Sequence, residues 1–400
     1  MEYENINYKM KKIFLGGCPF GDENLGDDAI LSSLLNTFGS RKDELTICKI
    51  DYNNNDYINE YVNKKRLNTK IYPNKFYSPP IFGFSINGRR NPIKAFFNYQ
   101  LDKRQIKSKD LLICGGGTLI TDLPWQIIKL VNISKKLNVP IILFGMGMAE
   151  IKDYNSIKFL QKSLNKLEDI YVRDLFVKSK LLAIGINEEK IKVCYDPAIA
   201  LMPNATLNIN NLFEKNEIEP YENDRIKIAI SLSSESDIKK ETDFNAINSI
   251  IKYLINKYNA IIFLIPTSHY KHCDTLFMSK LSINSNVILI KKRFEPEDLI
   301  QFLSKFHLVL SSRLHLNIFS SIVGTPFIGL IRNSKISDFS TLLELNSYYF
   351  NEIGSKAFYT YLDFMIENNK SIRKKILNNI EMMRSVHIDC VEEIFKKYLA

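Results

Sequence analysis

HLVLSSRLHLNIFSSIVGTPFIGL, residues 307–330, combines a strand-like run with a helix-like run. A short apolar segment ends at Leu310, two serines follow, and apolar residues then recur at helical spacing until a Gly-x-Pro break and a second apolar run to Leu330. This pattern predicts a buried strand, a helix capped by Ser312 and closed by residues 324–326, and another buried strand. Such a unit is typical of α/β domains with a parallel sheet.

Two ionisable residues lie at the start of the predicted helix. With Ser312 as the N-cap, Arg313 and His315 fall in the first turn, where backbone N–H groups without helical partners and the positive end of the dipole face outward. In an open α/β sheet, ligands bind at this edge. The position predicts an anion site with a titratable group beside it. An ordinary capped helix with a solvated arginine and a half-buried histidine fits the pattern equally well.

Strand-like runs that end in glycine-rich or polar turns recur in both halves of the chain, for example at residues 11–17, 111–118, 141–148, 227–232 and 260–265. A length of 400 residues exceeds what one hydrophobic core usually supports. We therefore predict two Rossmann-like α/β domains that face a central cleft, residues 1–203 and 225–400, joined by a polar linker at 204–224. A last helix, 371–398, is expected to pack back across the domain boundary.

The composition restricts the class of protein. With 45% hydrophobic and 24% charged residues, the chain is an ordinary globular protein. The net charge of +10 favours an acidic ligand, an anionic membrane face or nucleic acid. Basic and aromatic residues gather in segment 61–109, where Asp102 is the only acid; we expect loops and short helices there, outside the sheet. Without an apolar leader or a membrane-spanning run, we expect a cytoplasmic protein.

Several common sites are missing from the sequence. The glycine-rich turns lack the Gly-Lys-Ser/Thr of a phosphate loop, the first of them does not match a dinucleotide fingerprint, and no Gly-x-Ser-x-Gly elbow occurs. Residues 269–273, HYKHC, lack a carboxylate or second cysteine at metal-ligand spacing. The six cysteines are scattered and resemble reduced core residues. We therefore expect neither a metal nor a cofactor.

Two further segments carry candidate residues. Arg173 ends a short strand at 170–172, so it could meet Arg313 from the other half on one anion across the cleft; a plain ion pair with Asp174 is the alternative. Asn24 and Asp27 lie at the start of the first helix, where capping and contact with a substrate are equally compatible with the sequence.

A series of short motifs follows a fixed order along the chain: Asn24-x-Gly26-Asp27, Gly115-Gly-Gly117 with Asp122, Gly145-x-Gly147, Val172-Arg-Asp174, Asp196-Pro-Ala198, Ser312-Arg-Leu-His315, Gly324-x-Pro326 and Lys335 in the loop that follows. In this order and spacing, the chain resembles the polysaccharide pyruvyl transferase family over nearly its whole length. The family has a two-domain, glycosyltransferase-B-like fold. Its members move the enolpyruvyl carbons of phosphoenolpyruvate onto paired sugar hydroxyls, which forms a cyclic pyruvate ketal and releases phosphate.

The resemblance implies a role for each matching residue. Arg173 and Arg313 would hold the donor's carboxylate and phosphate, the backbone of Leu314 would assist, and His315 would be the acid–base residue. The residues assigned to acceptor binding are Asn24, Asp27, Gly116, Gly117, Asp122, Lys335 and His269.

The partners expected are phosphoenolpyruvate as co-substrate and a saccharide acceptor, either a polysaccharide or a lipid-linked precursor. The basic aromatic segment 61–109 would suit docking of that acceptor at the inner membrane face, or it is a solvated lid. Two other hypotheses stay open: a nucleotide-sugar-dependent glycosyltransferase or epimerase on the same fold, and a non-catalytic glycan- or nucleic-acid-binding protein. Nucleic acid is the weaker case, because basic residues outside 61–109 are interspersed with acids.

Overall fold

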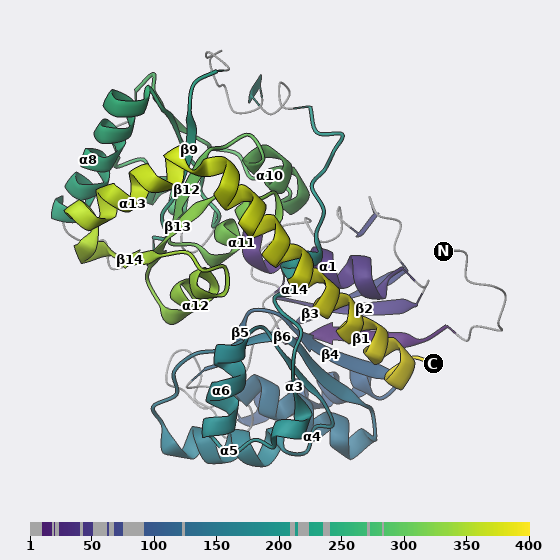
Figure 1. Cartoon of the computed structure of the whole chain (residues 1–400). Helices are drawn as coiled ribbons and strands as arrows, with labels where there is room; N and C mark the ends of the chain where they lie inside the picture. Colours follow the sequence, from purple (N-terminus) through teal and green to yellow (C-terminus); the bar gives the residue numbers. More distant parts are fainter. Residues whose placement is uncertain are drawn as a thin grey trace. The chain divides into compact units, whose positions relative to one another are not determined.

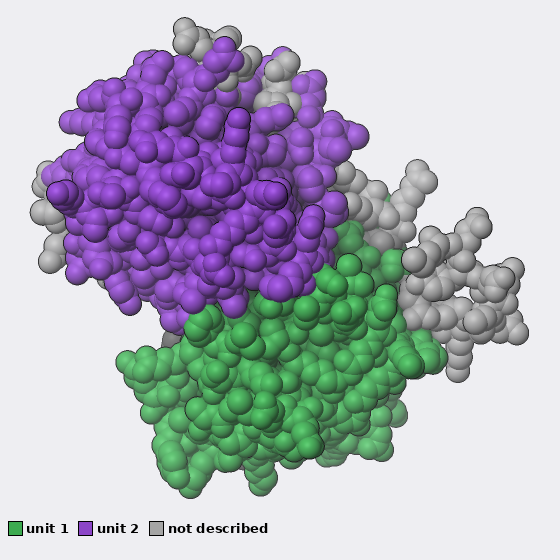
Figure 2. Space-filling view, in the orientation of Figure 1, with its two compact units in different colours: residues 1–22, 30–197, 385–400 green, residues 23–29, 198–384 purple. Residues whose placement is uncertain are grey.

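The computed structural model describes residues 10–17, 20, 24–40, 43–50, 62–63, 68–74, 92–121, 125–208, 213–214, 224–234, 241–269, 273–281 and 284–400. The chain divides into two compact units (Figure 2). Unit 1 consists of Met1–Asp22, Ile30–Pro197 and Ser385–Ala400, and unit 2 of Glu23–Ala29 and Ala198–Arg384. These units are defined by contacts within the fold, whereas the domain limits at 203 and 225 were inferred from the polar composition of the segment between them. Those limits stay a prediction.

Unit 1 contains an eight-stranded sheet with the order β3-β2-β1-β4-β6-β7-β8, in which β5 pairs with β6. All its strand pairs are parallel. The strands are β1 (Lys12–Gly16), β2 (Glu44–Ile50), β3 (Thr69–Asn74), β4 (Leu111–Gly115), β5 (Thr118–Ile120), β6 (Ile141–Met148), β7 (Ile170–Val172) and β8 (Ile191–Val193). The helical segments of this part of the chain are α1 (Leu25–Phe38), α3 (Pro92–Ile106), α4 (Trp125–Leu137), α5 (Tyr154–Leu164), α6 (Leu175–Ala183), η1 (Glu188–Lys190) and η2 (Pro197–Ala200).

Both faces of this sheet are buried. Successive residues of β4 alternate between two apolar clusters: Leu112 packs with residues of α3, α4, α5 and α6, whereas Leu111 and Ile113 pack with residues of α1 and the end of α14 (Asn369–Tyr398). Figure 1 shows the helices on either side of these strands. A central strand that must be apolar on both faces reads as a continuous hydrophobic run, which explains the pattern LLICG at β4.

Unit 2 contains a six-stranded parallel sheet with the order β11-β10-β9-β12-β13-β14. Its strands are β9 (Lys227–Ser231), β10 (Ile261–Leu264), β11 (Val287–Leu289), β12 (Leu308–Ser311), β13 (Phe327–Ile331) and β14 (Ser347–Tyr349). Its helices are α8 (Glu241–Tyr258), α9 (Asp274–Met278), α10 (Pro296–Leu303), α11 (Leu314–Ile322), α12 (Ser334–Leu342), the 3₁₀ turn η3 (Phe350–Glu352), α13 (Lys356–Glu367) and the first part of α14. Two parallel-sheet α/β units are therefore confirmed.

The decisive unit at 307–330 folds as β12, α11 and β13. Gly324 has a φ of 72° one residue past the C-cap Val323, so it closes α11 as expected. An amphipathic helix on the surface of a protein buries one face, but α11 is buried on more than one. Leu316, Phe319 and Ser320 are buried in addition to the apolar residues that recur at helical spacing. Since nearly all residues of α11 are buried, packing on several sides holds the start of this helix at the carboxyl edge of the sheet.

Other segments differ from the sequence-based expectations. Residues 69–74, assigned to an excursion outside the sheet, form the strand β3 beside β2. Pro73 in this strand cannot donate a backbone hydrogen bond, which a strand at the edge of a sheet tolerates. Helix α3 occupies residues 92–106, and the expectations for 64–67 and 75–91 lie outside the described residues. In the described part of the chain, no helix is both long and apolar enough to cross a membrane.

Candidate functional site

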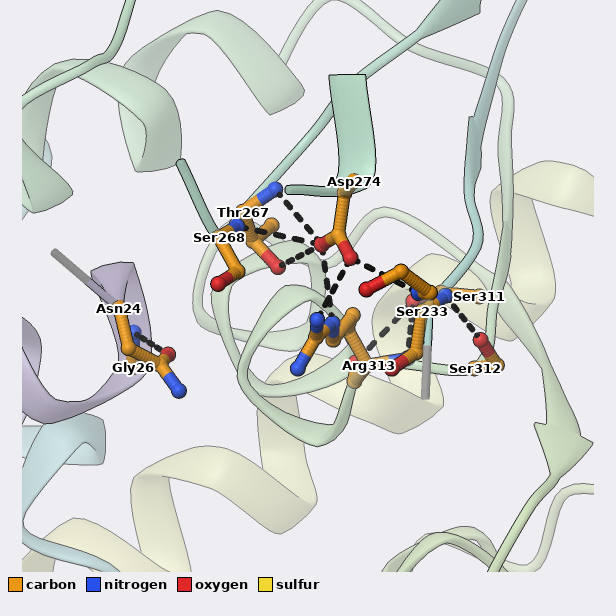
Figure 3. Close-up of polar contacts among 10 residues, drawn as sticks. Asn24, Gly26, Ser233, Thr267, Ser268, Asp274, Ser311, Ser312 and Arg313 are labelled. Carbon is orange, nitrogen blue, oxygen red and sulfur yellow. Dashed lines mark hydrogen bonds and ion pairs between the residues drawn. The ribbon is translucent and has the colours of Figure 1, made fainter. Parts of the chain in front are cut away.

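Arg313 stands at the carboxyl end of β12, directly before α11 (Figure 3). The Ser311 hydroxyl accepts a hydrogen bond from the Arg313 N–H (2.9 Å) and donates one to the Arg313 carbonyl oxygen (3.0 Å). The Ser312 N–H donates to the carbonyl oxygen of Ser231 at the end of β9 (3.0 Å). The backbone at Arg313 is therefore fixed by its own turn and by the neighbouring strand.

The prediction that Ser312 caps α11 was wrong. Arg313 is the N-cap residue, and its side chain makes no capping hydrogen bond. The Ser312 hydroxyl instead accepts a hydrogen bond from the Ser233 N–H (2.8 Å), which ties the turn after β12 to the turn after β9. His315 still lies in the first helical turn, and the N–H of Leu314 belongs to that turn as well.

The guanidinium of Arg313 is held by a carboxylate that the sequence did not suggest. Arg313 Nε donates to Asp274 Oδ2 (3.0 Å) and Nη2 donates to Oδ1 (2.6 Å), a two-pronged pair. Arg313 is 8% exposed and Asp274 is 0% exposed. Removing one member of so deeply buried a pair typically costs about 3–5 kcal/mol, because the other charge remains in the interior.

Asp274 is held in turn by backbone N–H groups that follow two other strands. The N–H groups of Thr267 (3.3 Å) and Ser268 (3.1 Å) donate to Oδ2, and the N–H of Ser234 (2.9 Å) donates to Oδ1. The Thr267 hydroxyl also donates to Oδ2 (3.4 Å). Figure 3 shows the carboxylate between the Thr267–Ser268 turn and the Arg313 side chain. Turns after β9, β10 and β12 therefore meet at one buried carboxylate.

A segment from the start of the chain completes this part of unit 2. Asn24 forms an isolated antiparallel bridge with Ser268, and the Leu25 N–H donates to the Thr267 carbonyl oxygen (2.9 Å). The Asn24 side chain accepts a hydrogen bond from the Gly26 N–H (3.0 Å), so it caps α1. The capping role that the sequence allowed for Asn24 is therefore present, whereas its assignment to acceptor binding stays a prediction.

The imidazole of His315 lies against Gly26. A Cβ built on Gly26 would fall 2.0 Å from His315 Nδ1, a separation that real Cβ atoms essentially never show. The ring centroid of His315 is also 6.3 Å from that of Phe319. Only a residue without a side chain can occupy position 26 while the imidazole keeps this place.

Two acids follow Gly26. Asp27 is half-buried, and its assignment to acceptor binding stays a prediction. Asp28 is buried and forms an ion pair with Arg293 from the loop before α10. Burial raises the pKa of Asp28 to about 7, and the positive charge of Arg293 opposes this rise. Asp28 is thus a buried carboxyl of unit 2 that keeps its proton to higher pH than a carboxyl in water does.

Arg173 lies in unit 1 after β7, and 7% of it is exposed. Its Nε donates to Asp174 Oδ2 (3.2 Å), and the Asp174 side chain also caps α6 through the Val177 N–H. A Cβ at Gly147 would lie 2.9 Å from Arg173 Cζ, so the guanidinium crosses the backbone of that glycine. The expected ion pair with Asp174 exists but is buried, and the meeting of Arg173 and Arg313 on one anion stays a prediction.

The other candidate residues are dispersed over both units. Gly116 and Gly117 form the positive-φ turn after β4 in unit 1. His269 is half-buried and adjoins Ser268. Lys335 lies in the first turn of α12, not in a loop as expected, because the helix begins directly after β13 at Ser334. Asp122 lies outside the described residues. Among those that are described, no group of three or more His, Cys, Asp or Glu could hold a metal ion.

Sequence reasoning missed Asp274 and its supporting turns. One signal was available: small hydroxyl residues follow three strands of the second half, at Ser233, Thr267 and Ser312. The strands of a parallel sheet end at one edge, which brings the turns that follow them together.

Comparison with known proteins identifies a family and a fold. The model of the polysaccharide pyruvyl transferase family matches residues 24–334. No curated protein sequence matches the chain.

Solved structures resemble the chain over almost its full length. A UDP-GlcNAc 2-epimerase from Neisseria meningitidis bound to UDP-GlcNAc has 13% identity and a TM-score of 0.63, with 96% of this chain and 99% of that chain covered. The UDP-GlcNAc 2-epimerase from Methanocaldococcus jannaschii has 17% identity and a TM-score of 0.59, with 89% and 92% covered. A glycosyltransferase from Rickettsia africae has 13% identity and a TM-score of 0.59, with 98% and 100% covered. At such identities the likeness establishes the fold alone, which is glycosyltransferase-B-like.

Proposed function

Because the chain belongs to the polysaccharide pyruvyl transferase family, we propose that it transfers pyruvate from phosphoenolpyruvate to two hydroxyls of one sugar. The products are a cyclic pyruvate ketal and phosphate. The acceptor is a sugar of a cell-surface polysaccharide or of its lipid-linked precursor. The family match covers both Arg313 and His315, the two residues to which the reaction is assigned.

The observation that carries this proposal is the position of Arg313 and His315 on a single helical turn. A guanidinium and an imidazole lie two residues apart at the start of α11, where the helix dipole is positive. Phosphoenolpyruvate carries a carboxylate and a phosphate, which match a planar guanidinium and helix N–H groups. An imidazole beside such an anion is suited to move protons near neutral pH.

The chemistry requires one acid–base group and fixed positive charge. Protonated His315 donates a proton to the methylene carbon of phosphoenolpyruvate, which leaves an electron-deficient carbon that carries the carboxylate and the phosphate. A sugar hydroxyl attacks this carbon and loses its proton to the neutral imidazole. The bond from carbon to the phosphate oxygen then breaks, the second hydroxyl closes the ring, and its proton leaves with phosphate.

Positive charge assists both steps. Arg313 stabilises the phosphate as it leaves, and it lies in a buried site where charge interactions are stronger than in water. We propose Arg173 as the second cation, for the donor's carboxylate. The acceptor is proposed to meet Asn24, Asp27, His269, Lys335 and the Gly116–Gly117 turn.

The test is phosphate release from phosphoenolpyruvate with a panel of cell-surface glycans and lipid-linked saccharides. We expect release only with an acceptor, and we expect loss of about 10²–10⁴-fold in rate for His315→Ala, the usual contribution of a general acid–base residue. Phosphate release that is unchanged in His315→Ala would refute the assigned role. Calorimetric binding of UDP-sugars without binding of phosphoenolpyruvate would favour a nucleotide-sugar enzyme instead.

A further inference from the structure

The buried carboxylate of Asp274 is the feature of unit 2 that the proposed reaction leaves unexplained. It lies at the first residue of α9, 39 residues before Arg313 in the sequence, and receives two N–H groups of the Arg313 guanidinium. We infer that Asp274 is a positioning residue: its carboxylate forms a socket that holds the Arg313 guanidinium in the orientation that meets the anionic donor. This inference rests on the proposed function.

The socket has polar partners other than the arginine. Backbone N–H groups of Ser234, Thr267 and Ser268 point at the carboxylate, and these groups belong to turns fixed by the parallel strands β9 and β10. Donors of this kind stabilise the ionised carboxylate without any help from Arg313. The acidic partner is therefore held by the backbone of unit 2, whereas the longer arginine side chain gains its orientation from the carboxylate.

The contact between Arg313 and Asp274 fixes the orientation of the guanidinium as well as its distance from the carboxylate. A two-pronged contact through Nε and Nη2 fixes both the plane of the guanidinium and its rotation in that plane. An unrestrained arginine side chain has many rotamers, and a displacement of about 1 Å at a binding group can cost about 10²-fold in rate. The contact thus selects one orientation of Arg313 from many.

A purely structural role is the competing explanation, since Asp274 also joins the turns after β9 and β10. The two explanations differ in one respect. A structural role predicts that losses from changes at positions 274 and 313 add together, whereas a positioning role predicts that Asp274→Asn has little further effect once Arg313 is absent.

The experiment measures the affinity for phosphoenolpyruvate by calorimetry, together with the thermal unfolding of each variant. We expect Asp274→Asn to weaken binding by about 10²-fold, Arg313→Ala by at least as much, and the double variant to bind no more weakly than Arg313→Ala alone. Asp363→Asn is the matched control. Asp363 is another carboxylate of unit 2, and it accepts hydrogen bonds from Lys257, Tyr253 and Tyr258 that the substitution weakens. The affinity of this variant for phosphoenolpyruvate should equal that of the wild type. Wild-type affinity in Asp274→Asn, or strictly additive losses, would overturn the inference.

Chemical rescue is a second test of whether Asp274 holds the guanidinium of Arg313. In Arg313→Ala, low millimolar guanidinium chloride should raise the melting temperature and restore part of the affinity for phosphoenolpyruvate, while ammonium chloride at equal ionic strength should do neither. The rescue should vanish in the Asp274→Asn/Arg313→Ala variant. Equal effects of both salts would overturn the inference even if Asp274→Asn does not fold. If the wild-type chain does not bind phosphoenolpyruvate, the proposed function is wrong, and so is phosphoenolpyruvate as the anion that Arg313 meets. The melting temperatures with guanidinium still decide whether the Asp274 carboxylate binds a guanidinium group at this position.

Discussion

Replacing Gly26 by alanine tests the placement of His315 most directly. The new Cβ would lie 2.0 Å from His315 Nδ1, whereas ordinary contact begins at 3.4 Å. One of the two groups therefore has to move by about 1.4 Å. The backbone at Gly26 belongs to α1 and is tied to Thr267 through Leu25, so the imidazole is the part expected to move.

The size of the effect follows from this displacement. A catalytic group misplaced by about 1 Å can lose about 10²-fold in rate, so we expect Gly26→Ala to reduce kcat for phosphate release by about 10²-fold or more. The stability change should be modest. Overpacking typically costs about 1–3 kcal/mol, and the better helix propensity of alanine returns up to about 1 kcal/mol.

The assay compares kcat for phosphate release with the free energy of unfolding in two glycine variants. Gly329→Ala is the control, because its Cβ would crowd Ile336 Cγ2 and Ser340 Oγ at 2.8 Å in the same unit, and the nearest atoms to that Cβ belong to Ile336, Ser340 and Ser347 rather than to His315. We expect both variants to lose stability and only Gly26→Ala to lose kcat. Full activity in Gly26→Ala, or equal losses of activity in both, would refute the reasoning that the bare α-carbon positions the imidazole.

Three further changes test other parts of the molecule. Gly147→Ala would put a Cβ 2.9 Å from Arg173 Cζ, so the KM for phosphoenolpyruvate should rise by about 10-fold or more; an unchanged KM would remove Arg173 from the donor site. The pKa of Asp28 is raised from 3.8 to about 7, so the folded state binds more protons than the unfolded state between these values. The free energy of unfolding should therefore fall as pH rises from about 4 to 7, and Asp28→Asn should flatten that slope in urea titrations; a slope that persists in the variant contradicts the assignment. Lys129→Met should destabilise the protein by about 3–5 kcal/mol, because it strands the buried carboxylate of Asp102, 2.6 Å from Lys129 Nζ; a loss below about 1 kcal/mol in denaturant unfolding would show that the pair is not buried in solution.

Elements with a strong local pattern could be predicted from the sequence. The strand–helix–strand unit at 307–330 was correct because its apolar periodicity and its Gly-x-Pro break are properties of neighbouring residues. The capping of α1 by Asn24 is local for the same reason. By contrast, β3 has few apolar residues and contains Pro73, so its place at the edge of the sheet was missed.

Contacts between distant residues could not be read in this way. Ser312 looked like a helix cap, but its hydroxyl is occupied by the Ser233 N–H from another strand's turn. The carboxylate that orients Arg313 comes from Asp274, and the surface on which His315 rests comes from Gly26. Sequence reasoning identified the chemical groups, whereas their supports depend on topology that a single sequence does not display.

The attachment of residues 23–29 to unit 2 has a consequence for how this protein is made. During synthesis these residues leave the ribosome long before Thr267, to which Leu25 is hydrogen-bonded. The early segment must wait for its partner, and closing so long a loop is a slow, late step of folding. A fragment that begins at Ala198 would lack the surface beneath His315, so dividing the gene at the apparent boundary should yield a second half whose imidazole has lost its support.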